Sequence, residues 1–120
     1  MSKKTLILGA SPNPERHSNK ALIRLKRYGH EVVAIGAKTQ IVEGIEIQVG
    51  QPWADDIHTI AMYINPSLQA NYYDYIISLK PKRIIFNPGT ENYELIKLGR
   101  VNDIEIVEGC VLVMLCTNNY

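Results

Sequence analysis

The chain has few of the features that mark metal sites, disulfide frameworks or membrane anchors. Its only cysteines, Cys110 and Cys116, lack Cys-x-x-Cys spacing and have no histidine pair nearby. Neither a zinc site nor a disulfide framework is therefore indicated. The longest apolar stretch, 110–116, is far too short to cross a bilayer, and Lys3 and Lys4 lead into a strand, with no apolar signal-peptide core. These absences predict a cytoplasmic protein without a metal.

An excess of charge of one sign is also missing. Lysine and arginine total 13, aspartate and glutamate total 12, and the formal net charge is +1, which gives no reason to expect nucleic acid or a membrane as partner. The length of 120 residues fits one domain, 1–120, because such a chain buries about two thirds of its unfolded surface. Binding is therefore expected at a local site that takes a small molecule.

The segment 5–25 has the pattern of a buried strand, a polar turn and an amphipathic helix. Thr5–Leu8 is a short apolar run, typical of a parallel strand that is covered on both faces. Ser18 or Asn19 is expected to cap the following helix. Such a turn directs free backbone N–H groups and the positive end of a helix dipole to one place, so the loop 10–18 is a natural anion site.

The rest of the chain continues to alternate strands with helices. Periodicity cannot decide whether 110–115 is a strand or a helical turn, and Trp53 is expected to cap the core. The alternation predicts an α/β, Rossmann-like, open and mostly parallel sheet with helices on both faces, and ligands bind such sheets at the carboxyl ends of the strands. Strands are predicted at 31–35, 45–49 (a minor edge strand), 57–64, 83–86 and 104–107; a helix after Asn65 buries Leu68, Tyr72, Tyr75, Ile76 and Leu79, and another, capped by Thr90, spans 93–99.

The glycines of a dinucleotide-binding fingerprint are absent. Gly-x-Gly-x-x-Gly needs its second and third glycines for close approach to the phosphates and to the helix, but here Gly9 is followed by Ala-Ser-Pro-Asn-Pro. Arg16 and His17 instead place a cation and possible donors beside the helix start, which favours a phosphate held by charge as well as by backbone. A solvated turn with a surface arginine fits this loop equally well.

An acidic residue is missing at the end of the second strand. NAD-binding enzymes usually place Asp or Glu there to bind the ribose hydroxyls, whereas this chain has Lys38. A cation suits a phosphorylated ribose, which allows the 2′-phosphate of NADP or the 3′-phosphate of coenzyme A. A lone lysine is more often simply solvated, so Lys38 is informative only because Arg16 supplies a second cation.

The segments GASPNPERHSNKAL and VVAIGAK, with Glu108-x-Cys110 near the end, resemble the small bacterial CoA-binding proteins. They are also similar to the N-terminal CoA-binding domain of the succinyl-CoA synthetase α subunit, and the resemblance covers essentially the whole chain. It implies a Rossmann-like domain whose first turn holds the CoA phosphates through Ser11, Arg16 and Ser18. The chain has no second domain and no phosphohistidine segment, so ligase activity is not implied.

The resemblance and the strand-end rule together define the candidate site. The expected cofactor is coenzyme A or an acyl-CoA. No catalytic residues are predicted, because no set of side chains supplies nucleophile, acid and base. The candidate cofactor-binding residues are Gly9, Ala10, Ser11, Arg16, His17, Ser18, Lys38, Ile64, Asn65, Pro66, Asn87, Pro88, Gly89 and Cys110.

Cys110 has two interpretations. It is either a small buried hydrophobe or a thiolate at a helix start that forms a reversible mixed disulfide with CoA.

The predicted function is a stand-alone, non-catalytic CoA-binding protein with a carrier, sensor or regulatory role. The alternatives are an NADP-binding oxidoreductase subunit, disfavoured by the missing glycines, and a Rossmann-like interaction protein with an empty pocket.

Overall fold

The strands form one mostly parallel sheet. In the computed structural model, which describes residues 2–120, the seven-stranded sheet has the order β3-β4-β2-β1-β5-β6-β7. All pairs are parallel except β3 with β4, so the predicted α/β architecture is confirmed. The strands are β1 (Thr5–Ala10), β2 (Val32–Gly36), β3 (Gln40–Val42), β4 (Ile45–Gln48), β5 (Thr59–Met62), β6 (Arg83–Phe86) and β7 (Glu105–Glu108).

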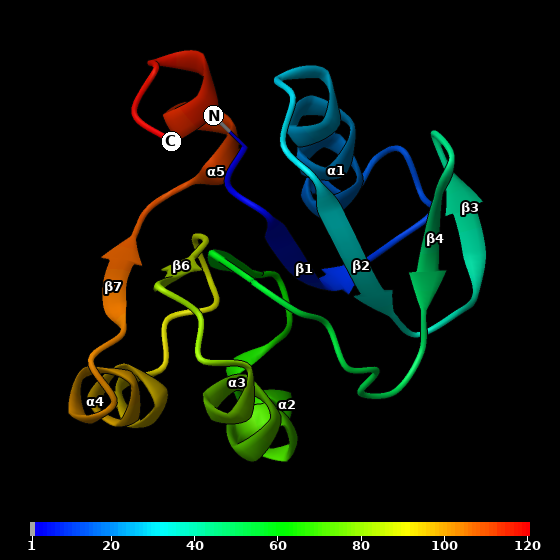
Figure 1. Cartoon of the computed structure of the whole chain (residues 1–120). Helices are drawn as coiled ribbons and strands as arrows, with labels where there is room; N and C mark the ends of the chain where they lie inside the picture. Colours follow the sequence, from blue (N-terminus) through cyan, green and yellow to red (C-terminus); the bar gives the residue numbers. More distant parts are fainter. Residues whose placement is uncertain (1) are drawn as a thin grey trace.

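Helices cover both faces of the sheet (Figure 1), as predicted. One face carries α1 (His17–Arg27) and α5 (Val111–Cys116). The other carries α2 (Pro66–Gln69), the 3₁₀ turn η1 (Ala70–Tyr72), α3 (Tyr73–Leu79) and α4 (Tyr93–Val101). No helix within residues 2–120 combines the length and apolar character that a membrane span requires.

The central strand β1 is buried on both faces. Leu6 and Leu8 pack into the core beneath α3 and α4, whereas Ile7 packs into the core beneath α1 and α5. Successive side chains of a strand point to opposite faces, and here both faces are covered. The continuous apolar run of β1 is explained by this double burial.

The order in which the strands are added to the sheet reverses at β1. From β1 the chain proceeds to β2 and β4 on one side, and it then returns past β1 to β5 on the other. Ligands bind open α/β sheets where the strand order reverses in this way. The carboxyl ends of β1 and β5 therefore mark the expected site.

Gly9 brings these strand ends close together. It has a φ of 106°, and a Cβ at Gly9 would lie 2.9 Å from the carbonyl carbon of Tyr63. The register of β1 against β2 shifts between Leu8 and Ala10. The strand therefore does not stop at Gly9, as the sequence suggested, but continues through an irregularity to Ala10.

Several predicted strand boundaries were wrong. The strand predicted over 57–64 is only Thr59–Met62, because pairing with β1 and β6 extends over those four residues. The strand predicted over 45–49 is β4, Ile45–Gln48. It is not an edge strand, since β3 pairs with its outer side. The ambiguous segment after Cys110 is helix α5. Trp53 does not cap the core, because it is 65% exposed.

The helix predicted after Asn65 is divided into α2, η1 and α3. Asn65 does cap its start, since its Oδ1 accepts from the Ser67 backbone N–H at 2.9 Å. The 3₁₀ turn has three residues per turn and not 3.6, which changes the face that each side chain occupies. As a result Leu68 is 53% exposed and Gln69 is fully buried, so the predicted burial of Leu68 was wrong.

A polar cluster lies at the amino ends of β5 and β6. Arg83 is buried, and its Nε donates to Thr59 Oγ1 at 2.7 Å. Its guanidinium lies 4.3 Å from the centre of the Tyr120 ring. The His30 Nδ1 accepts a hydrogen bond from the Lys3 backbone N–H at 2.9 Å, so this nitrogen must be unprotonated.

This cluster should make the protein acid-sensitive. His58 belongs to the same cluster, since its Nδ1 lies 2.7 Å from the Thr59 Oγ1. Burial, with added repulsion from Lys3 and Arg83, lowers the pKa of both His30 and His58 below 6.5. The unfolded chain then binds protons more tightly than the folded one, so the free energy of unfolding should be fully retained above pH 6.5 and should fall as the pH drops below it. Urea unfolding at pH 7.5 and 5.5 measures the loss. The double variant His30→Asn/His58→Asn should show a smaller loss, and an equal loss would contradict the assignment.

Candidate functional site

A cavity of about 820 Å³ opens at the carboxyl ends of β1, β2 and β5. Its position coincides with the reversal of the strand order, and its size lies within the usual range for small-molecule sites. The residues that line it are Leu8, Gly9, Ala10, Ser11, Pro12, Asn13, Glu15, Arg16, His17, Ser18, Ile35, Gly36, Ala37, Lys38, Tyr63, Ile64, Leu68, Asn71, Tyr72, Pro88 and Thr90.

Helix α1 begins at this cavity without a capping side chain. The N-cap residue is Arg16, not Ser18 or Asn19 as predicted, and no side chain of the described residues caps this helix. Its first turn holds no acidic residue. The first N–H groups of a helix have no partner within the helix, and its dipole places partial positive charge there. The start of α1 therefore offers donors and positive potential to an anion.

The loop that precedes α1 is held by its own side chains. The Ser11 Oγ accepts from the Asn13 backbone N–H at 3.1 Å, and the Asn13 Oδ1 accepts from the Glu15 backbone N–H at 3.0 Å. The Asn19 side chain is buried, and its Nδ2 donates to the Ser11 carbonyl at 3.0 Å. Asn19 thus ties the loop to the helix, which explains its burial although it is not a cap.

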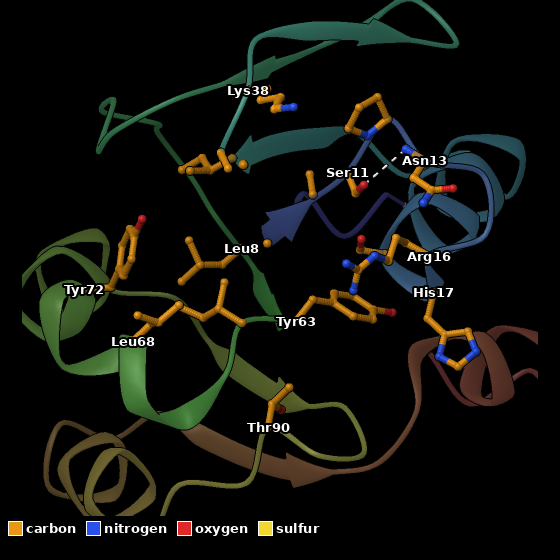
Figure 2. A pocket seen from close by; sticks show the side chains of 18 of the residues that line it. Leu8, Ser11, Asn13, Arg16, His17, Lys38, Tyr63, Leu68, Tyr72 and Thr90 are labelled. Carbon is orange, nitrogen blue, oxygen red and sulfur yellow. Dashed lines mark hydrogen bonds between the residues drawn. The ribbon is translucent and has the colours of Figure 1, made fainter.

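The cavity has walls of different chemistry (Figure 2). Arg16 and His17 lie on one side of it, and Leu68 and Tyr72 lie on the opposite side. Lys38 adds a second cation from the end of β2. A ligand with a charged part and a flat or apolar part matches this division.

Tyr63 lies between these walls in Figure 2. Burial, with smaller effects from Cys110 and Tyr120, raises the pKa of Tyr63 far above its usual value of 10.0. Its hydroxyl therefore stays protonated at neutral pH. The phenol contributes a neutral surface to the cavity and not a base.

Most of the candidate residues predicted from the sequence meet at this cavity, and the rest lie outside its lining. Asn65 caps α2, with Pro66 in its first turn. Gly89 forms a turn with a φ of 92°. Those that line the cavity are Gly9, Ala10, Ser11, Arg16, His17, Ser18, Lys38, Ile64 and Pro88, and those that do not are Asn65, Pro66, Asn87, Gly89 and Cys110.

Asn87 supports the architecture behind the cavity. It is 3% exposed, its Nδ2 donates to the Met62 carbonyl at 3.0 Å, and its Oδ1 accepts from the Val111 backbone N–H at 2.9 Å. It therefore joins the end of β5 to the start of α5. The predicted cap, Thr90, bonds to the Asn87 carbonyl, and α4 is capped by Asn92 instead.

Cys110 is partly buried and precedes the first residue of α5. Because it is absent from the cavity lining, the mixed disulfide with CoA stays a prediction.

Much of the apolar lining is absent from the candidate residues predicted from the sequence. Tyr63 directly follows β5, where the strand-end rule places ligands, but it is not among the candidates, and Ile35 is the last residue but one of β2. Leu68, Asn71 and Tyr72 come from α2 and η1, and only the position of these segments in the fold brings them to the cavity.

Solved structures share this fold along nearly the whole chain. An uncharacterised protein of known crystal structure has 48% sequence identity and a TM-score of 0.97, with 100% of this chain and 99% of that one covered. A hypothetical protein from Pyrococcus horikoshii OT3 has 27% identity and a TM-score of 0.84, with 93% and 80% covered. A protein from Thermus thermophilus at 20% identity and a TM-score of 0.84, with 99% and 91% covered, shares the fold. No curated protein matches the chain.

The family model described as "CoA binding domain" matches residues 3–115. The chain belongs to the CoA-binding domain family. The matched range includes every residue that lines the cavity. Family membership supports a role in binding CoA.

Proposed function

We propose that this CoA-binding domain is a non-catalytic protein that holds coenzyme A or an acyl-CoA in the cavity, with the diphosphate over the loop 11–18. The observation that carries the proposal is the start of α1, where Arg16 stands at an uncapped helix end facing the cavity. An anion there gains backbone donors, the helix dipole and a guanidinium together.

The remaining walls suit the other parts of CoA. Lys38 supplies a cation for the phosphate on the ribose. Leu68 and Tyr72 offer apolar and aromatic surface to the adenine or to the pantetheine chain. The polar groups of the cavity thus serve to hold an anionic ligand, and the role is that of a carrier, sensor or regulatory subunit.

A thermal-shift comparison of CoA, acetyl-CoA, NADP and NAD tests the proposal. A ligand at a hundredfold its dissociation constant should stabilise the protein by about 2.7 kcal/mol, and CoA or acetyl-CoA should give the largest shift. A larger shift with NADP would favour an oxidoreductase subunit. No shift with any of the four would favour an interaction protein with an empty pocket.

Lys38→Ala should weaken binding of CoA by about fivefold, the equivalent of about 1 kcal/mol for an exposed ion pair. Binding of dephospho-CoA, which lacks the ribose phosphate, should change less than the binding of CoA. Calorimetric titration of both ligands measures the difference. Lys20→Ala removes an exposed lysine of α1 that does not line the cavity and serves as the control. Equal weakening of both ligands would show that Lys38 does not contact this phosphate.

A further inference from the structure

The Gln69 side chain joins the loops that follow β5 and β6. Gln69 is fully buried, and its Nε2 donates to the carbonyl oxygens of Ile64 at 3.1 Å and Thr90 at 2.8 Å. Ile64 and Thr90 both line the cavity, whereas Gln69 does not. One amide group thus links residues from different segments of the cavity wall.

The other end of the Gln69 amide is also bonded. Its Oε1 accepts from the Asn92 Nδ2 at 3.0 Å, and the same Nδ2 lies 2.8 Å from the Tyr73 hydroxyl. The Asn92 Oδ1 caps α4 by accepting from the Glu94 backbone N–H at 3.1 Å. Buried hydrogen bonds of this kind are strengthened by the low dielectric, and a fully satisfied network rigidifies its surroundings. The link between the two loops is therefore anchored to α3 and α4.

We propose that Gln69 is a positioning residue of the ligand site, which sets the separation of the Ile64 and Thr90 loops and so the width of the cavity. The inference rests on the proposed CoA function. Gln69 acts through the backbone of the residues that line the cavity and needs no contact with the ligand. Its burial in place of Leu68 puts its amide between the two loops.

Gln69→Met tests the proposal, because methionine has a similar length and no donor. Both carbonyls then lose their hydrogen-bond partner. Because a buried acceptor without a partner is unfavourable, the two loops should separate. The variant should bind CoA at least about fivefold more weakly than the parent, measured by calorimetry where urea unfolding shows both to be folded.

Thr59→Val is the matched control. It removes the acceptor of the Arg83 Nε at the opposite end of β5, so it also lowers stability through a buried hydrogen bond, but Thr59 does not line the cavity. This control should bind CoA within about twofold of the parent, a difference of less than 0.5 kcal/mol. Equal CoA affinities in Gln69→Met and Thr59→Val would overturn the proposal.

Amide hydrogen exchange gives a readout that needs no ligand. The Thr90 N–H, bonded to the Asn87 carbonyl at 3.0 Å, should exchange faster in Gln69→Met relative to the N–H of Ile84 in the core strand β6. Equal acceleration of both would mean that Gln69 contributes only to global stability, and would overturn the inference. If the parent does not bind CoA, the proposed function fails, and the ratio of these exchange rates still decides whether Gln69 positions the loop.

Discussion

Replacing Gly36 with alanine should lower the free energy of unfolding by about 3 kcal/mol, at the upper end for an overpacked site, and should weaken ligand binding as well. A Cβ at Gly36 would lie 2.2 Å from the Ala10 carbonyl oxygen and 3.0 Å from the Ile47 Cγ2. The carbonyl belongs to the backbone of the central strand, so it can retreat only if β1 and β2 separate. Both Gly36 and Ala10 line the cavity, which means that the separation would also distort the site.

Urea unfolding of the parent and of Gly36→Ala measures this effect. Gly109→Ala is the control, because a Cβ there would have its nearest neighbour at 3.5 Å, in ordinary contact, and its unfolding midpoint should change little. A Gly36→Ala variant as stable as Gly109→Ala would show that β1 and β2 accommodate the methyl group, and would contradict the steric argument.

Arg16→Ala should weaken CoA binding by about 1.5 to 3 kcal/mol, which is the range for a hydrogen bond to a charged group and corresponds to about ten- to 150-fold. Arg16 is the N-cap residue of α1 and lines the cavity. Its removal leaves only the backbone donors and the helix dipole to hold the diphosphate. The loop itself should keep its shape, since Ser11, Asn13 and Asn19 hold it.

Calorimetric titration with CoA measures the loss. Arg24→Ala removes the same charge from the exposed side of the same helix, outside the cavity, and should leave the affinity almost unchanged. Raising the salt concentration should reduce the difference between Arg16→Ala and the parent, because it screens an exposed charge. Arg16→Ala binding as tightly as Arg24→Ala would remove Arg16 from the phosphate site.

The polar half of the candidate site could be predicted from the sequence. The loop 10–18 lies between a buried strand and an amphipathic helix, and its residues all belong to one short segment. Parallel strands bring their carboxyl ends to one edge of the sheet, so the order of the strands along the chain is enough to place Lys38 near Arg16. The predicted N-cap, Ser18 or Asn19, was wrong because α1 already begins at His17. The Asn19 side chain bonds to Ser11 instead, a contact that depends on the path of the loop.

The apolar half could not be predicted in the same way. The periodicity of 66–79 favours one continuous helix with Leu68 on its buried face. The 3₁₀ turn η1 changes that periodicity, and Gln69 takes the buried position with its amide bonded to Ile64 and Thr90. Polar side chains are seldom buried without partners, and those partners lie in other segments of the chain.

The sequence by itself determined the α/β class, the central strand and the position of the polar loop 10–18 before the first helix, because each depends on apolar spacing or on residues that are neighbours in the chain. Only the tertiary structure decided that Leu68 and Tyr72 line the cavity, that Cys110 lies outside its lining, and that Asn87 and Gln69 tie the strand ends together. From the neighbouring sequence, an asparagine or glutamine that becomes buried cannot be distinguished from one that stays on the surface. The role of a buried amide is set by which carbonyl and N–H groups the packed helices bring within hydrogen-bonding distance of it.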